Sequence, residues 1–361
     1  MAELDPDTLA TILETEGYGL IPLSSEQRMQ AALDIRSALK TASTEAEGAR
    51  ALRKRLECVA QLLSDETAGH LARLQIFWVE FGLPHAAAIL HDGTPAILVC
   101  RGLFDLVHFQ TTLNSACSLL RQTEAKLGMG GDPESLPSRR MNLAGYVILA
   151  DAYRHLRPPA TIADLLGPKA LLDVDLGVST SLVLLLLHEL GHVVLGHTDA
   201  RAASARATVD TVPDPGKSRE RLRLELEADA YALDGVAPQW RAQMLASLIC
   251  LHNVFHFFEI FGVRPAREYP TADQRLAALI ERMPLSGPDR VFADSWLGDY
   301  RRREATIAAR PSTADEMVNQ FDRTMDVATA YRVVDEIRAD LNASGIVLEK
   351  PDITLEPQAG A

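Results

Sequence analysis

Residues 181–197 read S-L-V-L-L-L-L-H-E-L-G-H-V-V-L-G-H, so two histidines and a glutamate lie inside an otherwise apolar run. His188 and His192 are four residues apart, and on an α-helix both imidazoles fall within about 40° of each other, where they can reach one ion. Glu189 projects about 100° around the helix, where its carboxylate can contact a water molecule on that ion without joining the ligands. This is the H-E-x-x-H pattern of a zinc site with a carboxylate general base.

The apolar residues on both sides of the histidines predict that this helix is buried. Leu182–Leu187 is continuously apolar, and the run resumes at Val193–Leu195. Burying ionisable groups without partners costs several kcal/mol, and a divalent cation is the simplest compensation. The alternative is a core helix whose polar side chains hydrogen-bond elsewhere. Gly196 is predicted to end the helix.

A second helix, predicted over Arg219–Leu233, supplies acidic side chains. Glu225 and Asp229 fall on the same face as apolar residues, so one carboxylate can bind the ion while the other orients a ligand histidine through its remaining N–H. We therefore predict Glu225 as the third ligand and Asp229 as its supporting residue. Glu227 is predicted on the solvent face and is the weaker ligand candidate. The predicted inner face consists of Leu222, Glu225, Leu226, Asp229, Ala232 and Leu233.

Three further histidines are candidates for supporting roles. His252 and His256 are four residues apart in an apolar, aromatic segment with no acid between them, so we interpret them as packed or supporting side chains. Either can donate a hydrogen bond to an oxyanion that develops in a transition state. His197 is predicted to point away from the metal face, with a role in helix termination or at the surface.

Outside these segments the sequence favours helices and one hairpin. Ala86–Val99 has two runs of β-favouring residues on either side of Asp92-Gly93, a turn signal. Such a hairpin beside a protease site can offer an edge strand to an extended substrate. We expect a mainly α fold with a small β-hairpin or sheet. The predicted parts are a helical module at 1–70, a core at 71–290 with an insertion at about 105–180, and a helical segment with a tail at 291–361.

The composition of the 361 residues limits location and partners. The formal net charge of −13 argues against nucleic acid or an anionic membrane as the main partner. Leu182–Leu195 and Leu245–Phe261 are too short or carry ionisable residues, so no membrane span is predicted. The N-terminus lacks the pattern of a signal peptide, and a cytoplasmic protein is expected. The cysteines, interpreted as reduced core thiols, are Cys58, Cys100, Cys117 and Cys250.

Together these motifs resemble those of zinc peptidases called gluzincins, because Glu225-x-x-x-Asp229 begins 33 residues after His192. Within that group, H-E-L-G-H-V-V-L-G-H and E-L-E-A-D-A-Y-A resemble the Ste-type and heat-shock membrane peptidase clan. The hairpin followed by R-G-L, and Tyr-Pro before Arg275, are similar to elements of that clan. The soluble phage-exclusion (Lit-type) peptidases are a second resemblance. Both imply a zincin-like catalytic core, whereas Leu195 and Thr198 exclude the metzincins.

The sequence therefore predicts a zinc-dependent endopeptidase that hydrolyses a protein or peptide substrate. His188, His192 and Glu225 bind Zn²⁺, and Glu189 takes a proton from the activated water and returns it to the leaving amine. Two alternatives stay open. The chain can be a regulatory protein that keeps a metallopeptidase core while its helical termini bind a partner, or a latent protease activated by a trigger such as phage infection. Glu189 favours the enzyme, because a structural metal site needs no base.

Overall fold

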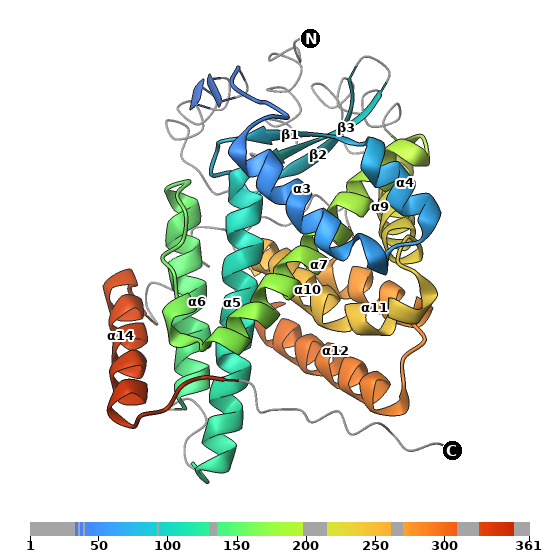
Figure 1. Cartoon of the computed structure of the whole chain (residues 1–361). Helices are drawn as coiled ribbons and strands as arrows, with labels where there is room; N and C mark the ends of the chain where they lie inside the picture. The colour runs from blue at the N-terminus through green and yellow to red at the C-terminus, as the bar shows by residue number, and fades with distance from the viewer. Residues whose placement is uncertain are drawn as a thin grey trace.

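The computed structural model describes most of the chain as a set of packed helices with a small sheet at one end (Figure 1). The described residues are 33–34, 37–38, 40–91, 94–129, 136–197, 215–260, 270–308 and 325–349. The longer helices among them are α3 (Glu47–Val59), α4 (Asp65–Arg73), α5 (Arg101–Lys126), α6 (Pro137–Arg154), α7 (Pro168–Val194), α9 (Pro215–Asp234), α10 (Leu245–Ile260), α11 (Ala272–Arg282), α12 (Gly287–Ala308) and α14 (Val327–Ala343). The predicted fold class, mainly α with a small sheet, is confirmed.

The sheet has three strands in the order β1-β3-β2. β2 (Ala86–His91) pairs with β3 (Thr94–Cys100) in an antiparallel register that places Ala88 opposite Ile97, so the predicted hairpin is confirmed. Its turn residues, Asp92 and Gly93, lie outside the described residues. β1 (Gln75–Val79), which the sequence analysis missed, pairs parallel to β3. β2 is therefore an edge strand of this sheet.

α7 is the central helix, and it is longer than the motif that revealed it. It begins at Pro168, where proline at the start of a helix sacrifices no hydrogen bond, and it ends at Val194. Gly196 follows with φ of 74°, a left-handed conformation that favours glycine, so its predicted role in ending the helix is confirmed.

The full length of α7 also changes how its hydropathy is interpreted. Among the described residues, α7 is the one helix long and apolar enough to cross a membrane, with a mean hydropathy of 2.0 over its most apolar 18 residues. The apolar run that stands out in the sequence, Leu182–Leu195, covers only the second half of this helix. In the fold, 61% of its most apolar window is buried inside the protein, as in the core helix of a folded domain.

Most of the buried apolar side chains of the described residues form one hydrophobic cluster. α5 packs against α6, α7 and α10, and α14 packs against the outer side of α6 (Figure 1). Residues 105–180, predicted as an insertion, contribute Leu106, Leu113 and Leu149 to this core. α3 packs on α7 through the same cluster. Residues 1–32 and the tail from 350 onward lie outside the described residues.

The interpretation of all four cysteines as core thiols is wrong for one of them. Cys100, Cys117 and Cys250 are buried free thiols, but Cys58 is exposed. Leu56 and Val59 fill the buried face of α3, and the helical repeat directs Glu57 and Cys58, which lie between them, outward.

Candidate metal centre

Three ligand-type side chains converge between α7 and α9. The Nε2 atoms of His188 and His192 are 3.1 Å apart. Glu225 Oε2 lies 3.3 Å from His188 Nε2, and Glu225 Oε1 lies 3.6 Å from His192 Nε2. All three residues are buried, with relative exposures of 6%, 0% and 3%. The structure thus brings together the three residues that the sequence selected as ligands, and we call them the His-His-Glu cluster.

Small residues let the two helices approach closely enough to form the cluster. A Cβ atom added at Gly191 would lie 3.2 Å from the Cα atom of Ala228 and 3.1 Å from the Tyr231 ring. Gly191 sits directly before His192 on α7, and Ala228 is fully buried on α9. The glycine of the H-E-L-G-H motif therefore sets the distance over which Glu225 reaches the histidines.

The orientation of α9 separates the two candidate acids. Glu225 is buried, whereas the side chain of Glu227 is 41% exposed and accepts a hydrogen bond from Arg223. The predicted inner face is partly wrong, because Leu222 and Leu226 are only half-buried while Leu224 and Ala228 are buried. The buried face is rotated toward Ala228 because this residue meets Gly191, a contact that the helical wheel of a single segment cannot show.

Asp229 holds the far side of the His188 ring. Its Oδ1 atom lies 2.8 Å from His188 Nδ1, the nitrogen that faces away from the cluster. Arg275 on α11 donates to both carboxylate oxygens of Asp229, from Nη2 at 2.5 Å and from Nε at 2.8 Å. The Arg275 guanidinium also stacks 4.0 Å above the centre of the Phe255 ring. Arg275 was recognisable in the sequence only by its position after Tyr-Pro, and no role was predicted for it.

These contacts shift the pKa values of both partners. Burial alone would raise the pKa of Asp229, but Arg275 and His188 together lower it to about 2. Burial alone would lower the pKa of His188, but the charge of Asp229 and hydrogen bonds to Asp229 and Glu225 raise it to about 9. In the metal-free protein Asp229 is therefore an anion at neutral pH. His188 holds a proton that a metal ion would have to displace.

Glu189 lies outside the cluster, as its position on the helix predicted. Its Oε2 atom accepts a hydrogen bond of 2.9 Å from the backbone N–H of Ala88 on β2. This N–H points away from β3 and toward α7, so the edge of β2 that does not pair with β3 lies beside Glu189. Neither the contact nor the proximity of β2 to α7 follows from sequence spacing, because the two segments are 101 residues apart.

His197 is buried, so the part of the prediction that placed it at the surface is wrong. It is 4% exposed, and its Nδ1 atom lies 3.1 Å from His192 Nδ1. The prediction assumed that the helix continues to His197, but the left-handed turn at Gly196 ends it first. The chain then returns toward the helix, and the helical wheel no longer gives the direction of the side chain.

His252 and His256 are buried on α10 but do not join the His-His-Glu cluster. His252 Nε2 lies 2.8 Å from Asp273 Oδ1, and its Nδ1 atom accepts from Trp296 Nε1 at 3.5 Å. The His256 ring lies parallel to it, with centroids 6.2 Å apart. Transition-state support by either histidine stays a prediction.

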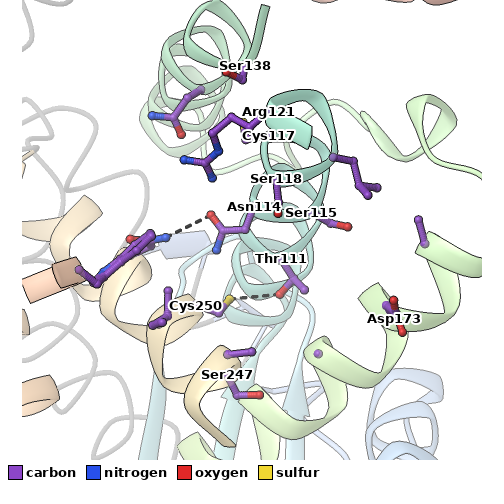
Figure 2. A pocket seen from close by; sticks show the side chains of 18 of the residues that line it. Thr111, Asn114, Ser115, Cys117, Ser118, Arg121, Ser138, Asp173, Ser247 and Cys250 are labelled. Atoms are coloured by element: carbon purple, nitrogen blue, oxygen red, sulfur yellow. Dashed lines mark hydrogen bonds between the residues drawn. The ribbon is translucent and has the colours of Figure 1, made fainter. Parts of the chain in front are cut away.

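A large cavity of about 880 Å³ lies elsewhere, between α5, α6, α7, α10 and α12. Asn114 accepts a hydrogen bond of 3.1 Å from Asn253 at its wall, and Thr111 lies 3.2 Å from Cys250 (Figure 2). Arg121 also projects from α5 into this space (Figure 2). No member of the His-His-Glu cluster lines this cavity, so its volume does not mark the candidate metal centre.

Comparison with known families gives one match, which covers the candidate centre. Residues 177–294, about a third of the chain, match the family Peptidase U49. The matched segment contains both histidines, Glu225, Asp229 and Arg275. No curated protein and no solved structure gave a match. This part of the chain is similar to a peptidase family, which agrees with the peptidase expected from the sequence.

Proposed function

We propose that the protein is a zinc-dependent endopeptidase, and the observation that carries the proposal is the buried His-His-Glu cluster within the segment that matches a peptidase family. The family match over residues 177–294 supports a peptidase as the general class of activity. The metal, the roles of individual residues and cleavage within a polypeptide are the proposal.

The chemistry and spacing of the cluster fit zinc. Two imidazole nitrogens and one carboxylate oxygen are donors that zinc accepts, whereas calcium and magnesium prefer sites made of oxygen alone. Bonds of about 2.0–2.1 Å at tetrahedral angles require ligand atoms about 3.3 Å apart. The separations of 3.1, 3.3 and 3.6 Å between His188, His192 and Glu225 lie around this value.

The number of ligands favours a catalytic site over a structural one. Within the described part of the chain, the candidate cluster has three ligand residues, and a catalytic zinc site keeps its fourth position for water or substrate. When bound there, zinc would polarise the scissile carbonyl and lower the pKa of a water molecule.

The protein's own residues then supply binding, orientation and proton transfer. Asp229, held by Arg275, fixes the His188 ring with its Nε2 atom toward the cluster. A carboxylate oxygen of Glu189 receives the proton of the attacking water and delivers it to the leaving amine nitrogen. Glu189 suits this role because it borders the cluster without belonging to the three ligands.

The edge of β2 supplies the binding surface for an extended peptide. Ala88 directs its backbone N–H away from β3 and toward Glu189, so a peptide that pairs with this edge passes the base and the cluster. Backbone pairing of this kind is independent of side chains, and the substrate is therefore a locally extended or unfolded polypeptide segment.

The proposal is tested by Glu189→Gln, which keeps the size of the side chain and removes the base. We expect the variant to fold and bind zinc as the wild type does, but to cleave unfolded casein at least about 100-fold more slowly. Glu281→Gln, an exposed acid on α11, is the matched control and should keep full activity. Undiminished cleavage by Glu189→Gln would refute the mechanism. Protein fragments that are present in cells expressing the wild type and absent from cells expressing Glu189→Gln would identify substrates.

A further inference from the structure

His197 occupies the position beside His192 that Asp229 occupies beside His188. The His192 and His197 rings meet edge to face, with centroids 5.2 Å apart and an angle of 62° between their planes. Their Nδ1 atoms are 3.1 Å apart, within hydrogen-bonding distance. The other ring nitrogen of His197, Nε2, lies 3.3 Å from Glu227 Oε2. His192, His197 and Glu227 therefore form a chain that runs from the cluster to the surface.

The positions of the protons in this chain follow from the ring geometry. His192 directs Nε2 toward His188 and Glu225, so a metal bound there leaves the His192 proton on Nδ1. That N–H can donate only if Nδ1 of His197 carries no proton. A neutral His197 then carries its proton on Nε2, which donates to the Glu227 carboxylate.

The outer end of the chain is held in place as well. Glu227 accepts a hydrogen bond from Arg223, one helical turn earlier on α9. Arg223 also pairs with Glu220, so one arginine is shared between two exposed carboxylates. The Gly196 turn, which delivers His197 to this position, and α9, which delivers Glu227, are thus both needed for the chain of contacts.

We infer that His197 and Glu227 are positioning residues for the metal ligand His192. They fix its tautomer and ring orientation, and they transmit the negative charge of Glu227 to the ligand through a neutral imidazole. His188 has the stronger support, a buried carboxylate in direct contact, whereas His192 has an indirect one that ends at the surface. The inference rests on the proposed function, because it assumes that the cluster binds a metal ion.

The experiment measures zinc affinity by chelator competition, together with the visible spectrum of the cobalt-substituted protein. His197→Phe removes both nitrogens, and we expect a 10- to 100-fold loss of zinc affinity and an altered cobalt spectrum. His197→Gln, whose carbonyl can accept from His192 Nδ1–H, should recover most of the affinity. Glu227→Gln should weaken binding by less than about 10-fold, because it acts only through His197. Glu281→Gln on α11 removes the same charge from an exposed acid outside this chain of contacts and should change affinity by less than about two-fold.

A comparison of double variants separates positioning from general packing. Adding Glu227→Gln to His197→Phe should cause no further loss, since the contact that transmits its effect has already been removed. Unchanged affinity and spectrum in both His197→Phe and Glu227→Gln would overturn the inference while leaving the proposed function intact. If His197→Phe does not fold, Glu227→Gln against Glu281→Gln decides the question. A folded wild type that binds neither zinc nor cobalt would overturn the proposed function and this inference together.

Discussion

The contact between Arg275 and Asp229 predicts how much unfolding free energy is lost when one side chain of this buried ion pair is removed. Arg275→Met removes two donors, at 2.5 and 2.8 Å, from a carboxylate that is only 6% exposed. Removing one partner of a buried ion pair costs about 3–5 kcal/mol, because the remaining charge is left without compensation. We expect the loss of unfolding free energy to lie near the lower value, since His188 remains as a second partner of Asp229. Methionine retains part of the packing against Phe255.

The assay is a double-mutant cycle with Asp229→Asn, measured on metal-free protein by urea unfolding at neutral pH. Arg275→Met leaves the buried Asp229 with His188 alone as its partner, and Asp229→Asn removes the carboxylate that faces Arg275, whereas the double variant removes both charges. The double variant should therefore lose about 2–3 kcal/mol less than the sum of the single losses. Single losses that add within about 0.5 kcal/mol would show that the two side chains do not interact as the structure places them, and would refute the reasoning.

Two further predictions concern the pH dependence and the packing of the site. Without metal the pKa of His188 is raised to about 9, so below this pH zinc must displace a proton from its ring. The apparent zinc affinity should therefore rise about 10-fold per pH unit between about pH 6.5 and 8.5. Chelator competition across this range measures how steeply zinc affinity depends on pH. Asp229→Asn should make this dependence shallower, and a zinc affinity that does not change with pH in the wild type would contradict the raised pKa. Gly191→Val should separate α7 from α9, lower the unfolding free energy by at least about 1–3 kcal/mol and weaken zinc binding. The control is Gly69→Ala on α4, where an added Cβ meets nothing within 4 Å. Equal thermal stability of Gly191→Val and the wild type would exclude the close contact between α7 and α9.

The cluster was predictable because its information is local in the chain. The four-residue spacing of His188 and His192 fixes their common face, and the separation of Glu225 from Glu227 around α9 allows only one of them to point inward. The hairpin was predictable for the same reason, since Asp92-Gly93 lies directly between its two strands. In each case the periodicity of one element decides which side chains share a face.

The remaining contacts depend on how distant elements meet, and spacing carries no such information. Arg275 reaches Asp229 across 46 residues, and Ala88 reaches Glu189 across 101. β1 was missed because its five residues, of mixed burial, are too few to show a clear alternation of apolar and polar side chains. Its partner β3 is parallel to it, so no hairpin turn between the two strands marks the pairing. His197 was misplaced for a local reason, because the helical wheel was extended past Gly196, whose left-handed conformation ends the helical repeat.

The most direct test of the central claim is the zinc content and coordination of the purified, folded wild-type chain after expression in zinc-replete medium. We expect about one zinc ion per chain, and X-ray absorption at the zinc edge should show two imidazole nitrogens and carboxylate oxygen at about 2.0–2.2 Å. Glu225→Gln should lower zinc affinity by at least about 100-fold, since a site with three protein ligands loses one of its bonds. A folded wild-type chain with almost no zinc, or a zinc ion that Glu225→Gln leaves undisturbed, would contradict the account.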